Sequence, residues 1–391
     1  MKYNFDEIID RSGTSATKME SLPKGCPDDA LPLWVADMDF ACAEPILKAL
    51  HERIDKKIFG YTMYDTDECL GAVVNWYKKR YGWEEKKENL FFCGGIVSAY
   101  AVLLNLLTKE GEGVVIQRPI YYPFTMKANS NGRQIVDSPL IYADGNYTID
   151  FDDLDKKMAE PNNKVLVFCS PHNPAGRVWT EEEIRKVVDI CKKYDKWIIC
   201  DEIHCDLLRC GMTFHPILKV APDYADRIAV CTAPSKTFNL ACFYSAYVVI
   251  KNKALRDQYN VVYDDYHFDY NYVGIEALIT AYNQCEYYVD QQNEYFRKNI
   301  ELVKSFIAEN MPEVKVIEPE ASYLLWIDFR AWNLTPFELV HLFQDAGVKL
   351  NNGANYGKPG MGFIRLNVAT QTAVLEKALE CMKKASEKRP K

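Results

Sequence analysis

The chain has 391 residues, of which 48% are hydrophobic and 26% charged, and this composition is typical of a folded globular protein. Its formal net charge of −8, without a basic run of useful length, argues against a surface that binds nucleic acid. No segment reaches the roughly 18 consecutive apolar residues of a membrane span, and the acidic start MKYNFDEIID has no apolar signal core, so we expect a cytoplasmic protein without a membrane partner.

The first predicted helix with a chemical feature lies at residues 91–107, FFCGGIVSAYAVLLNLL. Gly94 and Gly95 open this helix. Free backbone N–H groups and the helix dipole at such a start both favour a bound phosphate. A glycine pair before a helix is weak when it stands alone, so its meaning depends on the strands that follow.

Short apolar runs in the middle of the chain predict buried strands. They lie at 113–119, 164–171, 196–202, 227–233 and 245–250. Between the second and third runs, residues 180–195 predict an amphipathic helix that begins with a capping box of Thr180 and Glu183. Strand, helix and strand at this spacing indicate a parallel sheet, and near-continuous apolar strands indicate helices on both of its faces.

The pattern changes after about residue 282. Residues 290–311 predict a long helix, 314–329 alternate like an antiparallel hairpin, and 335–347 predict another helix. We therefore expect a large α/β domain at 46–281. A smaller α+β domain would combine 282–391 with residues 1–45, which lack clear periodicity.

The 13 cysteines are odd in number and scattered, often inside apolar runs, as expected in a reducing compartment. Cys200, Cys205 and Cys210 are evenly spaced. Zinc sites usually pair cysteines two to four residues apart, so a spacing of five predicts no metal site.

Three polar residues follow three of the predicted strands: Asn173, Asp201 and Lys236. Ligands of open α/β sheets bind beyond the carboxyl ends of the strands, where these residues would meet. Each also has a plain structural interpretation, because Asn173 could form a turn between its two prolines, Asp201 could cap a helix and Lys236 could lie on a surface loop. The structural interpretation is least convincing for Asp201 as a helix cap. A carboxylate at the end of so apolar a strand needs a hydrogen-bonding or cationic partner, such as a protonated ring nitrogen.

The segments SPHNPAGRVW, CDEIHCDL and SKTFNLA around these residues resemble the signature of fold-type I pyridoxal 5'-phosphate (PLP) enzymes, the aminotransferase class I/II superfamily. More narrowly, LPLWVADMDF, FGYT, PIYYPF, ASYLLWIDF and GFIRLNVA resemble the MalY/PatB-type cystathionine β-lyase (C–S lyase) group. The resemblance runs over nearly the whole chain with its motifs in order. It implies a PLP-dependent transferase-like α/β fold, whose large domain has a mostly parallel seven-stranded sheet covered by helices.

The resemblance implies roles for the strand-end residues. Lys236 would form a Schiff base with the PLP aldehyde and later move protons, Asp201 would pair with the pyridinium nitrogen, and Asn173 would donate to the ring phenolate oxygen. Tyr121 matches the aromatic residue that stacks on the ring, although it could also be a core tyrosine. His204 would support the edge of the ring or only pack.

Other matched positions concern the phosphate and the substrate. Gly95, Ile96, Val97 and Ser235 would bind the cofactor phosphate. Tyr61 matches a tyrosine that reaches the phosphate of the neighbouring subunit, which implies a homodimer with a shared active site. Arg365 would grip the substrate α-carboxylate through its guanidinium fork, although a salt bridge on a late strand would also explain an arginine there.

Two positions depart from the pattern. Ala233 stands where many relatives have a phosphate-binding serine, and Tyr244 stands where many aminotransferases carry a cation. Phosphate binding would therefore depend more on the start of the helix at residue 96 and on Tyr61.

These residues predict a PLP-dependent C–S β-lyase that releases pyruvate, ammonia and a thiol from L-cystathionine or a cysteine S-conjugate. An aminotransferase would use the same lysine, aspartate, amide and arginine, whereas the intact set of lysine, aspartate and arginine disfavours a non-catalytic PLP-fold protein. The subgroup motifs and the lack of an obvious second arginine for a dicarboxylate substrate favour the lyase.

Overall fold

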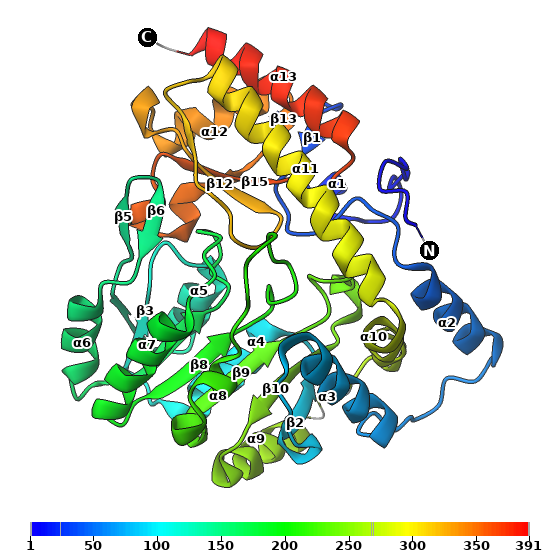
Figure 1. The fold of residues 1–391 in the computed structure, drawn as a ribbon, viewed down its shortest axis with the longest axis vertical. Helices are drawn as coiled ribbons and strands as arrows, with labels where there is room; N and C mark the ends of the chain where they lie inside the picture. Colours follow the sequence, from blue (N-terminus) through cyan, green and yellow to red (C-terminus); the bar gives the residue numbers. More distant parts are fainter. Residues whose placement is uncertain (1, 24, 267, 269, 390–391) are drawn as a thin grey trace.

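Seven strands in the middle of the chain form one sheet in the computed structural model, which describes residues 2–23, 25–266, 268 and 270–389. The order across the sheet is β2–β10–β9–β8–β7–β3–β4 (Figure 1). Only β10 runs against its neighbours; β2 and the other five strands share one direction. The strands are β2 Leu90–Cys93, β3 Gly113–Ile116, β4 Gln134–Asp137, β7 Asn163–Cys169, β8 Trp197–Asp201, β9 Ile228–Thr232 and β10 Ala246–Ile250. The five strands predicted from apolar runs are all present.

Helices cover both faces of this sheet because its strands are apolar on both sides. Val165 and Val167 of β7 pack into one core with α4, α5 and α9, whereas Leu166 and Phe168 pack into the other with α3, α6, α7, α8 and α10. These helices are α3 Asp67–Tyr81, α4 Ile96–Leu107, α5 Tyr122–Ser130, α6 Phe151–Ala159, α7 Glu181–Lys193, α8 Ile217–Val220, α9 Lys253–Asp265 and α10 Tyr272–Gln284. A short hairpin lies apart from the sheet, β5 Ile141–Ala143 with β6 Asn146–Thr148.

The predicted start of α7 is confirmed. Thr180 accepts from the backbone N–H of Glu183, and the Glu183 carboxylate accepts from that of Thr180, so the capping box is complete. Its apolar stripe, Ile184, Val187, Val188 and Cys191, is buried against the sheet.

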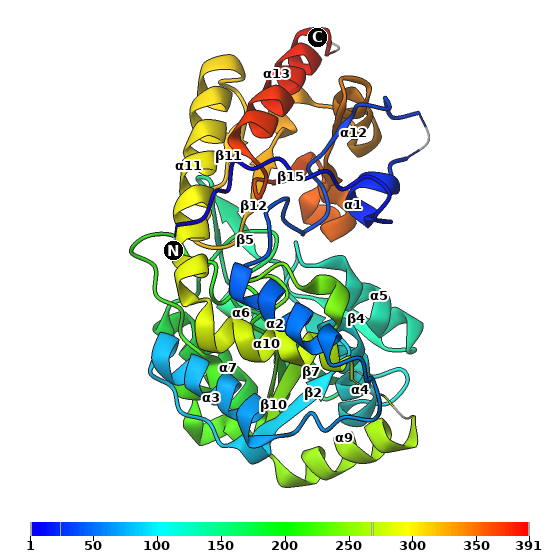
Figure 2. The ribbon, with the colours of Figure 1, turned by 90° about the vertical axis from the view of Figure 1, so that its right-hand side faces the viewer.

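The C-terminal part builds a second, antiparallel sheet in the order β11–β12–β15–β14. Figure 2 shows α11 running from the level of α10 along this part, with α13 beside it and α12 beyond α13. The elements are α11 Glu286–Asn310, β11 Lys315–Val316, β12 Leu324–Asp328, α12 Pro336–Asp345, β13 Val348–Lys349, β14 Asn351–Asn352, β15 Phe363–Asn367 and α13 Thr372–Lys388. The predicted long helix, hairpin and following helix correspond to α11, β11–β12 and α12.

The N-terminal segment packs with the C-terminal part. It contains α1 Thr17–Glu20 and β1 Leu31–Pro32, and β1 pairs in parallel with β13. Beyond it, α2 Glu44–Asp55 lies in the half of the molecule that holds the large sheet (Figure 2). Domain limits at 46–281, with 1–45 and 282–391 in the second domain, stay a prediction.

All 13 cysteines are free. Within the described residues, no group of three histidine, cysteine or acidic side chains could hold a metal ion. No described helix is both long and apolar enough to cross a membrane.

Candidate active site

The ends of three central strands bring the predicted residues together. In the register of the sheet, Asp201 at the end of β8 lies opposite Cys169 of β7 on one side and Cys231 of β9 on the other. Asn173 follows β7 within four residues and Lys236 follows β9 within four residues. Because these strands are parallel, an amide, a carboxylate and an amine meet at one edge of the sheet.

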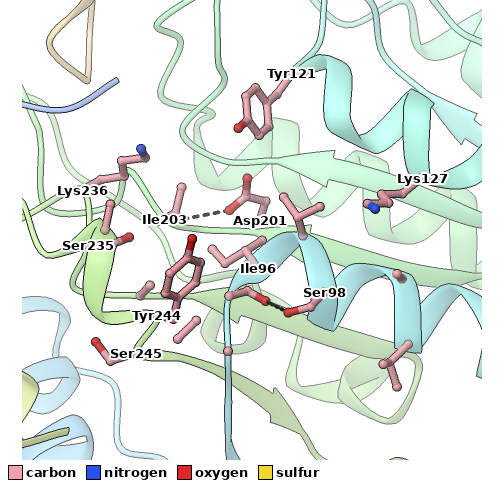
Figure 3. Close-up of a pocket in the computed structure, with 18 of the residues that line it drawn as sticks. Ile96, Ser98, Tyr121, Lys127, Asp201, Ile203, Ser235, Lys236, Tyr244 and Ser245 are labelled. Carbon is pink, nitrogen blue, oxygen red and sulfur yellow. Dashed lines mark hydrogen bonds between the residues drawn. The ribbon is translucent and has the colours of Figure 1, made fainter. Parts of the chain in front are cut away.

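A cavity of about 820 Å³ opens at this edge. It is lined by nine of the predicted residues, Gly95, Ile96, Val97, Tyr121, Asn173, Asp201, His204, Ser235 and Lys236. In Figure 3, Lys236 lies at the left, Tyr121 lies at the top and the Asp201 carboxylate lies below the Tyr121 ring. The predicted set is therefore one site, with the exception of Arg365 and Tyr61, which lie outside this lining.

Lys236 lies at the cavity wall. Its Nζ donates to the carbonyl oxygen of Ala36 at 2.7 Å. Burial, followed by the nearby Arg365 guanidinium, lowers the pKa of Lys236 to about 8. About a tenth of the amine is therefore uncharged and nucleophilic at pH 7, far more than for an ordinary lysine.

Asp201 is only 6% exposed, and its Oδ1 accepts from the backbone N–H of Ile203 at 3.1 Å. Burial raises the pKa of Asp201 to about 7, against the smaller opposing effects of this hydrogen bond and of the Lys236 charge. The carboxylate thus lacks a partner strong enough to offset its desolvation. A cation placed over it in the cavity would supply that partner.

Arg365, on β15, reaches the site through Asn173. Its Nη1 donates to Asn173 Oδ1 at 3.2 Å, and its Nη2 donates to the Trp34 carbonyl oxygen at 3.2 Å. The side chain is 3% exposed, and its Nε has no hydrogen-bond partner among the described residues. Buried donors are rarely left unpaired, so this nitrogen indicates a missing acceptor.

The start of α4 offers an anion site at the lower side of the cavity in Figure 3. Gly95 has a φ of 143°, which favours glycine, and no described side chain caps the helix. The Ser98 hydroxyl is engaged within the first turn of the helix, where it donates to the Gly95 carbonyl oxygen at 2.7 Å. The first N–H groups of the helix are therefore available to a phosphate.

His204 and Tyr121 form parts of the cavity wall. His204 is buried, packs edge-on against Tyr323, and its Nδ1 has no partner within the described chain. Burial lowers the pKa of His204 to about 3, so the ring is neutral. Burial raises the pKa of Tyr121, so this phenol stays protonated. His204 therefore lines the cavity and also packs, and its support of the ring edge stays a prediction.

Tyr61 lies in the segment between α2 and α3 and is fully exposed. Within one chain it does not join the other site residues. Of the two departures from the family pattern, Ala233 and Tyr244 both line the cavity, and Tyr244 has a φ of 51°. Figure 3 shows its hydroxyl directed into the cavity.

Sequence reasoning missed the part played by residues 34–36. The carbonyl oxygen of Trp34 accepts from Arg365, and that of Ala36 accepts from Lys236 and from the Tyr323 hydroxyl. Ala36 also lines the cavity. In the sequence, only the motif LPLWVADMDF pointed to a role for this segment. A backbone carbonyl can accept a hydrogen bond in any residue, so the residue types do not reveal this role.

The fold and the site together define a class of protein. The chain belongs to the aminotransferase class I and II family, whose sequence profile matches residues 28–381. Among curated relatives, cystathionine β-lyase PatB of Bacillus subtilis is 37% identical over 98% of this chain and 99% of its own length. Protein MalY of Escherichia coli is 30% identical over 96% of this chain and 97% of its own.

Solved structures agree with these relatives. The PLP-bound C–S lyase from Staphylococcus hominis has a TM-score of 0.93 at 36% identity, covering 98% of both chains. Cystalysin from Treponema denticola, which contains a PLP cofactor, has a TM-score of 0.96 at 34% identity, covering 99% of both chains. The predicted superfamily, fold class, cofactor and C–S lyase group are thereby confirmed.

Proposed function

We propose that the protein is a PLP-dependent C–S β-lyase that converts L-cystathionine or a cysteine S-conjugate, with water, to pyruvate, ammonia and a thiol. One observation carries the proposal: an amine of lowered pKa and a buried carboxylate without a sufficient cationic partner line one cavity, and an arginine with an unpaired donor reaches it through Asn173. Relatives named as cystathionine β-lyases, which match 90% or more of this chain, support the same reaction.

The residues present fit the cofactor. The free N–H groups at the start of α4 suit its phosphate, with Ser235 beside them, and Asp201 suits a protonated ring nitrogen. Asn173 and Tyr121 would hold the ring oxygen and the ring face. When bound, PLP supplies an electron sink for the negative charge that develops on the substrate Cα.

Lys236 would act at two moments. Its uncharged Nζ would bind the cofactor aldehyde, and the amine freed by the substrate would then take the proton from Cα. A pKa of about 8 suits both tasks, because the amine is neither fully protonated nor too weak a base near neutral pH. In the β-elimination, the Cα–H bond and the Cβ–S bond break, and the sulfur leaves as a thiol once it is protonated.

Arg365 would bind the substrate α-carboxylate. Its Nη atoms are already held by Asn173 and Trp34, which fix the plane of the guanidinium, and its Nε is unpaired. A guanidinium that is already held in one plane and has an unpaired N–H donor orients a carboxylate at little cost in side-chain entropy.

A product assay tests the reaction. Purified protein loaded with PLP is incubated with L-cystathionine, with S-methylcysteine, and with L-alanine plus a keto acid. We expect pyruvate and thiol in equal amounts from the first two and little new amino acid from the third. A new amino acid without thiol would instead establish an aminotransferase, and binding of PLP without any turnover would leave a non-catalytic member of the fold.

We further propose a homodimer in which Tyr61 reaches the phosphate subsite of the partner. Exposed apolar side chains support an interface on both surfaces concerned. The segment around Tyr61 carries Ile58, Phe59 and Met63, all mostly exposed, and the mouth of the cavity carries the exposed Tyr244 and Tyr266. We place the protein in the cytoplasm, a proposal that its 13 free cysteines support.

Mixing an impaired variant with an inactive one tests the shared site. Tyr61→Ala is assayed at limiting PLP, where loss of a phosphate contact is expected to cost at least about tenfold in activity. Lys236→Ala is inactive. In a refolded mixture, half of the dimers are mixed, and each mixed dimer regains one complete site if Tyr61 acts across the interface. We therefore expect about a quarter of the wild-type activity at the same PLP concentration. No recovery, or a monomer in sedimentation analysis, would refute the arrangement.

A further inference from the structure

A buried carboxylate outside the cavity holds the residue next to Lys236. Asp206 lies in the segment after β8 and is 2% exposed. Its Oδ1 accepts from Trp76 Nε1 at 3.1 Å and from the Tyr81 hydroxyl, both on α3. Its Oδ2 accepts from the Thr237 hydroxyl at 2.9 Å.

Thr237 is fixed on two sides. Besides the bond of its hydroxyl to Asp206, its carbonyl oxygen accepts from Gln292 Nε2 of α11 at 2.7 Å. Both Thr237 and Gln292 are completely buried. The turn itself closes through the Phe238 N–H, which donates to the Pro234 carbonyl oxygen at 2.9 Å. The lysine therefore belongs to a loop anchored from β8, α3 and α11, although its own side chain touches none of these anchors.

A cation lies near the Asp206 carboxylate, and hydrogen bonds to an ionised group are shorter and stronger than bonds between neutral groups. Burial raises the pKa of Asp206, and the Arg80 guanidinium, whose Nε lies 4.0 Å from Asp206 Oδ1, opposes this effect. Arg80 in turn pairs with Asp290 of α11 at 2.9 Å. Asp206 thus has three hydrogen-bond donors and a cation, and only the bond to Thr237 leads towards the cavity.

We propose that Asp206 and Thr237 are positioning residues for Lys236, fixing the loop so that Nζ enters the cavity beside Ala36, Asp201 and Arg365. The inference rests on the proposed function of Lys236. Trp76, Tyr81 and Arg80 all face Oδ1 and hold Asp206 in place, whereas Oδ2 is left to accept from Thr237. The bond fixes the backbone on which the reactive amine is mounted, and a small displacement of such a group is costly in rate.

The distinguishing measurement follows Lys236 itself. In the cofactor-free protein, the rate at which PLP is incorporated depends on the uncharged amine, and the visible absorption of the lysine-bound cofactor reports it. The charged groups that face Nζ are Arg365, Asp37 and Asp201, with neutral His204 at the cavity wall. When the loop is loosened, water reaches Nζ, and Nζ moves away from Arg365. The pH midpoint of PLP incorporation should therefore rise towards the pKa of an ordinary lysine.

The test compares Thr237→Val, which keeps the shape and removes the hydroxyl, with Thr237→Ser, which keeps the hydroxyl. We expect the valine variant to raise the pH midpoint by about half a unit or more and to lower kcat about tenfold, with KM changed less than twofold. The serine variant should stay close to wild type in all three. Thr280→Val, at a buried threonine of α10, controls for the burial of a methyl group in place of a hydroxyl.

Asp206→Asn provides a second variant if Thr237→Val does not fold, and we expect it to move the midpoint in the same direction. Wild-type midpoints and kcat in Thr237→Val, or equal losses in the valine and serine variants, would overturn the inference while the proposed function stands. Failure of the wild-type protein to incorporate PLP would overturn the proposed function and with it the inference.

Discussion

Replacing Lys236 by alanine is expected to abolish the covalent attachment of PLP and to lower kcat by at least about 10³-fold. The amine would both bind the cofactor and move the Cα proton, and the described lining of the cavity offers only one other amine, that of Lys127 on α5. The visible absorption of the lysine-bound cofactor should disappear. Reduction with borohydride followed by peptide mass spectrometry should label Lys236 in the wild type and nothing in the variant.

Lys127→Ala is the matched control, because it removes the other lysine of the same cavity (Figure 3). It should retain both the absorption band and the labelled peptide. A label on Lys127, or an unchanged band in Lys236→Ala, would show that the wrong lysine has been assigned.

The sequence alone predicts the strand-end residues well, for a physical reason. Strand–helix–strand units with apolar strands impose a parallel sheet, and a parallel sheet brings the carboxyl ends of its strands to one edge. Asn173, Asp201 and Lys236 could therefore be placed together before any distance was known. The sheet register, which sets Asp201 between β7 and β9, agrees with that placement.

Other parts of the site depend on contacts between distant segments and could not be predicted in this way. The carbonyl of Ala36 accepts from Lys236 across 200 positions of sequence, and Thr237 bonds to Asp206 from a neighbouring strand end. The position of Arg365 beside Asn173 needs the C-terminal sheet to pack over the edge of the large one. Family resemblance named the arginine, but only the packing explains why its Nε is free.

Asp201→Asn is expected to reduce kcat by about 10²–10³-fold while PLP still binds, because an amide cannot balance the positive charge of a protonated ring nitrogen. The same change should stabilise the cofactor-free protein at high pH. Burial raises the pKa of Asp201 from 3.8 to about 7. Between these two values the folded chain holds a proton that the unfolded chain releases, so the free energy of unfolding falls as pH rises through this window and stays low above it.

A pKa that is raised by about 3 in the folded chain corresponds to at most about 4 kcal/mol in the free energy of unfolding. We therefore expect the free energy of unfolding of cofactor-free Asp201→Asn to exceed that of wild type by about 1–4 kcal/mol at pH 8. At pH 3, below both pKa values, the difference should vanish. Urea denaturation of the two cofactor-free proteins at both pH values measures it.

Glu202→Gln separates this effect from catalysis. Glu202 is a completely buried neighbour outside the cavity lining, and burial raises its pKa to about 8. It should share the gain in stability at high pH but not the loss of kcat. If Asp201→Asn keeps a wild-type kcat, or if both variants lose activity alike, then Asp201 does not act on the cofactor. Asp201 would then destabilise the cofactor-free protein and still be required for turnover. This is expected of a carboxylate whose cationic partner arrives with the cofactor, because a cation in the cavity offsets the free energy lost on burying the negative charge.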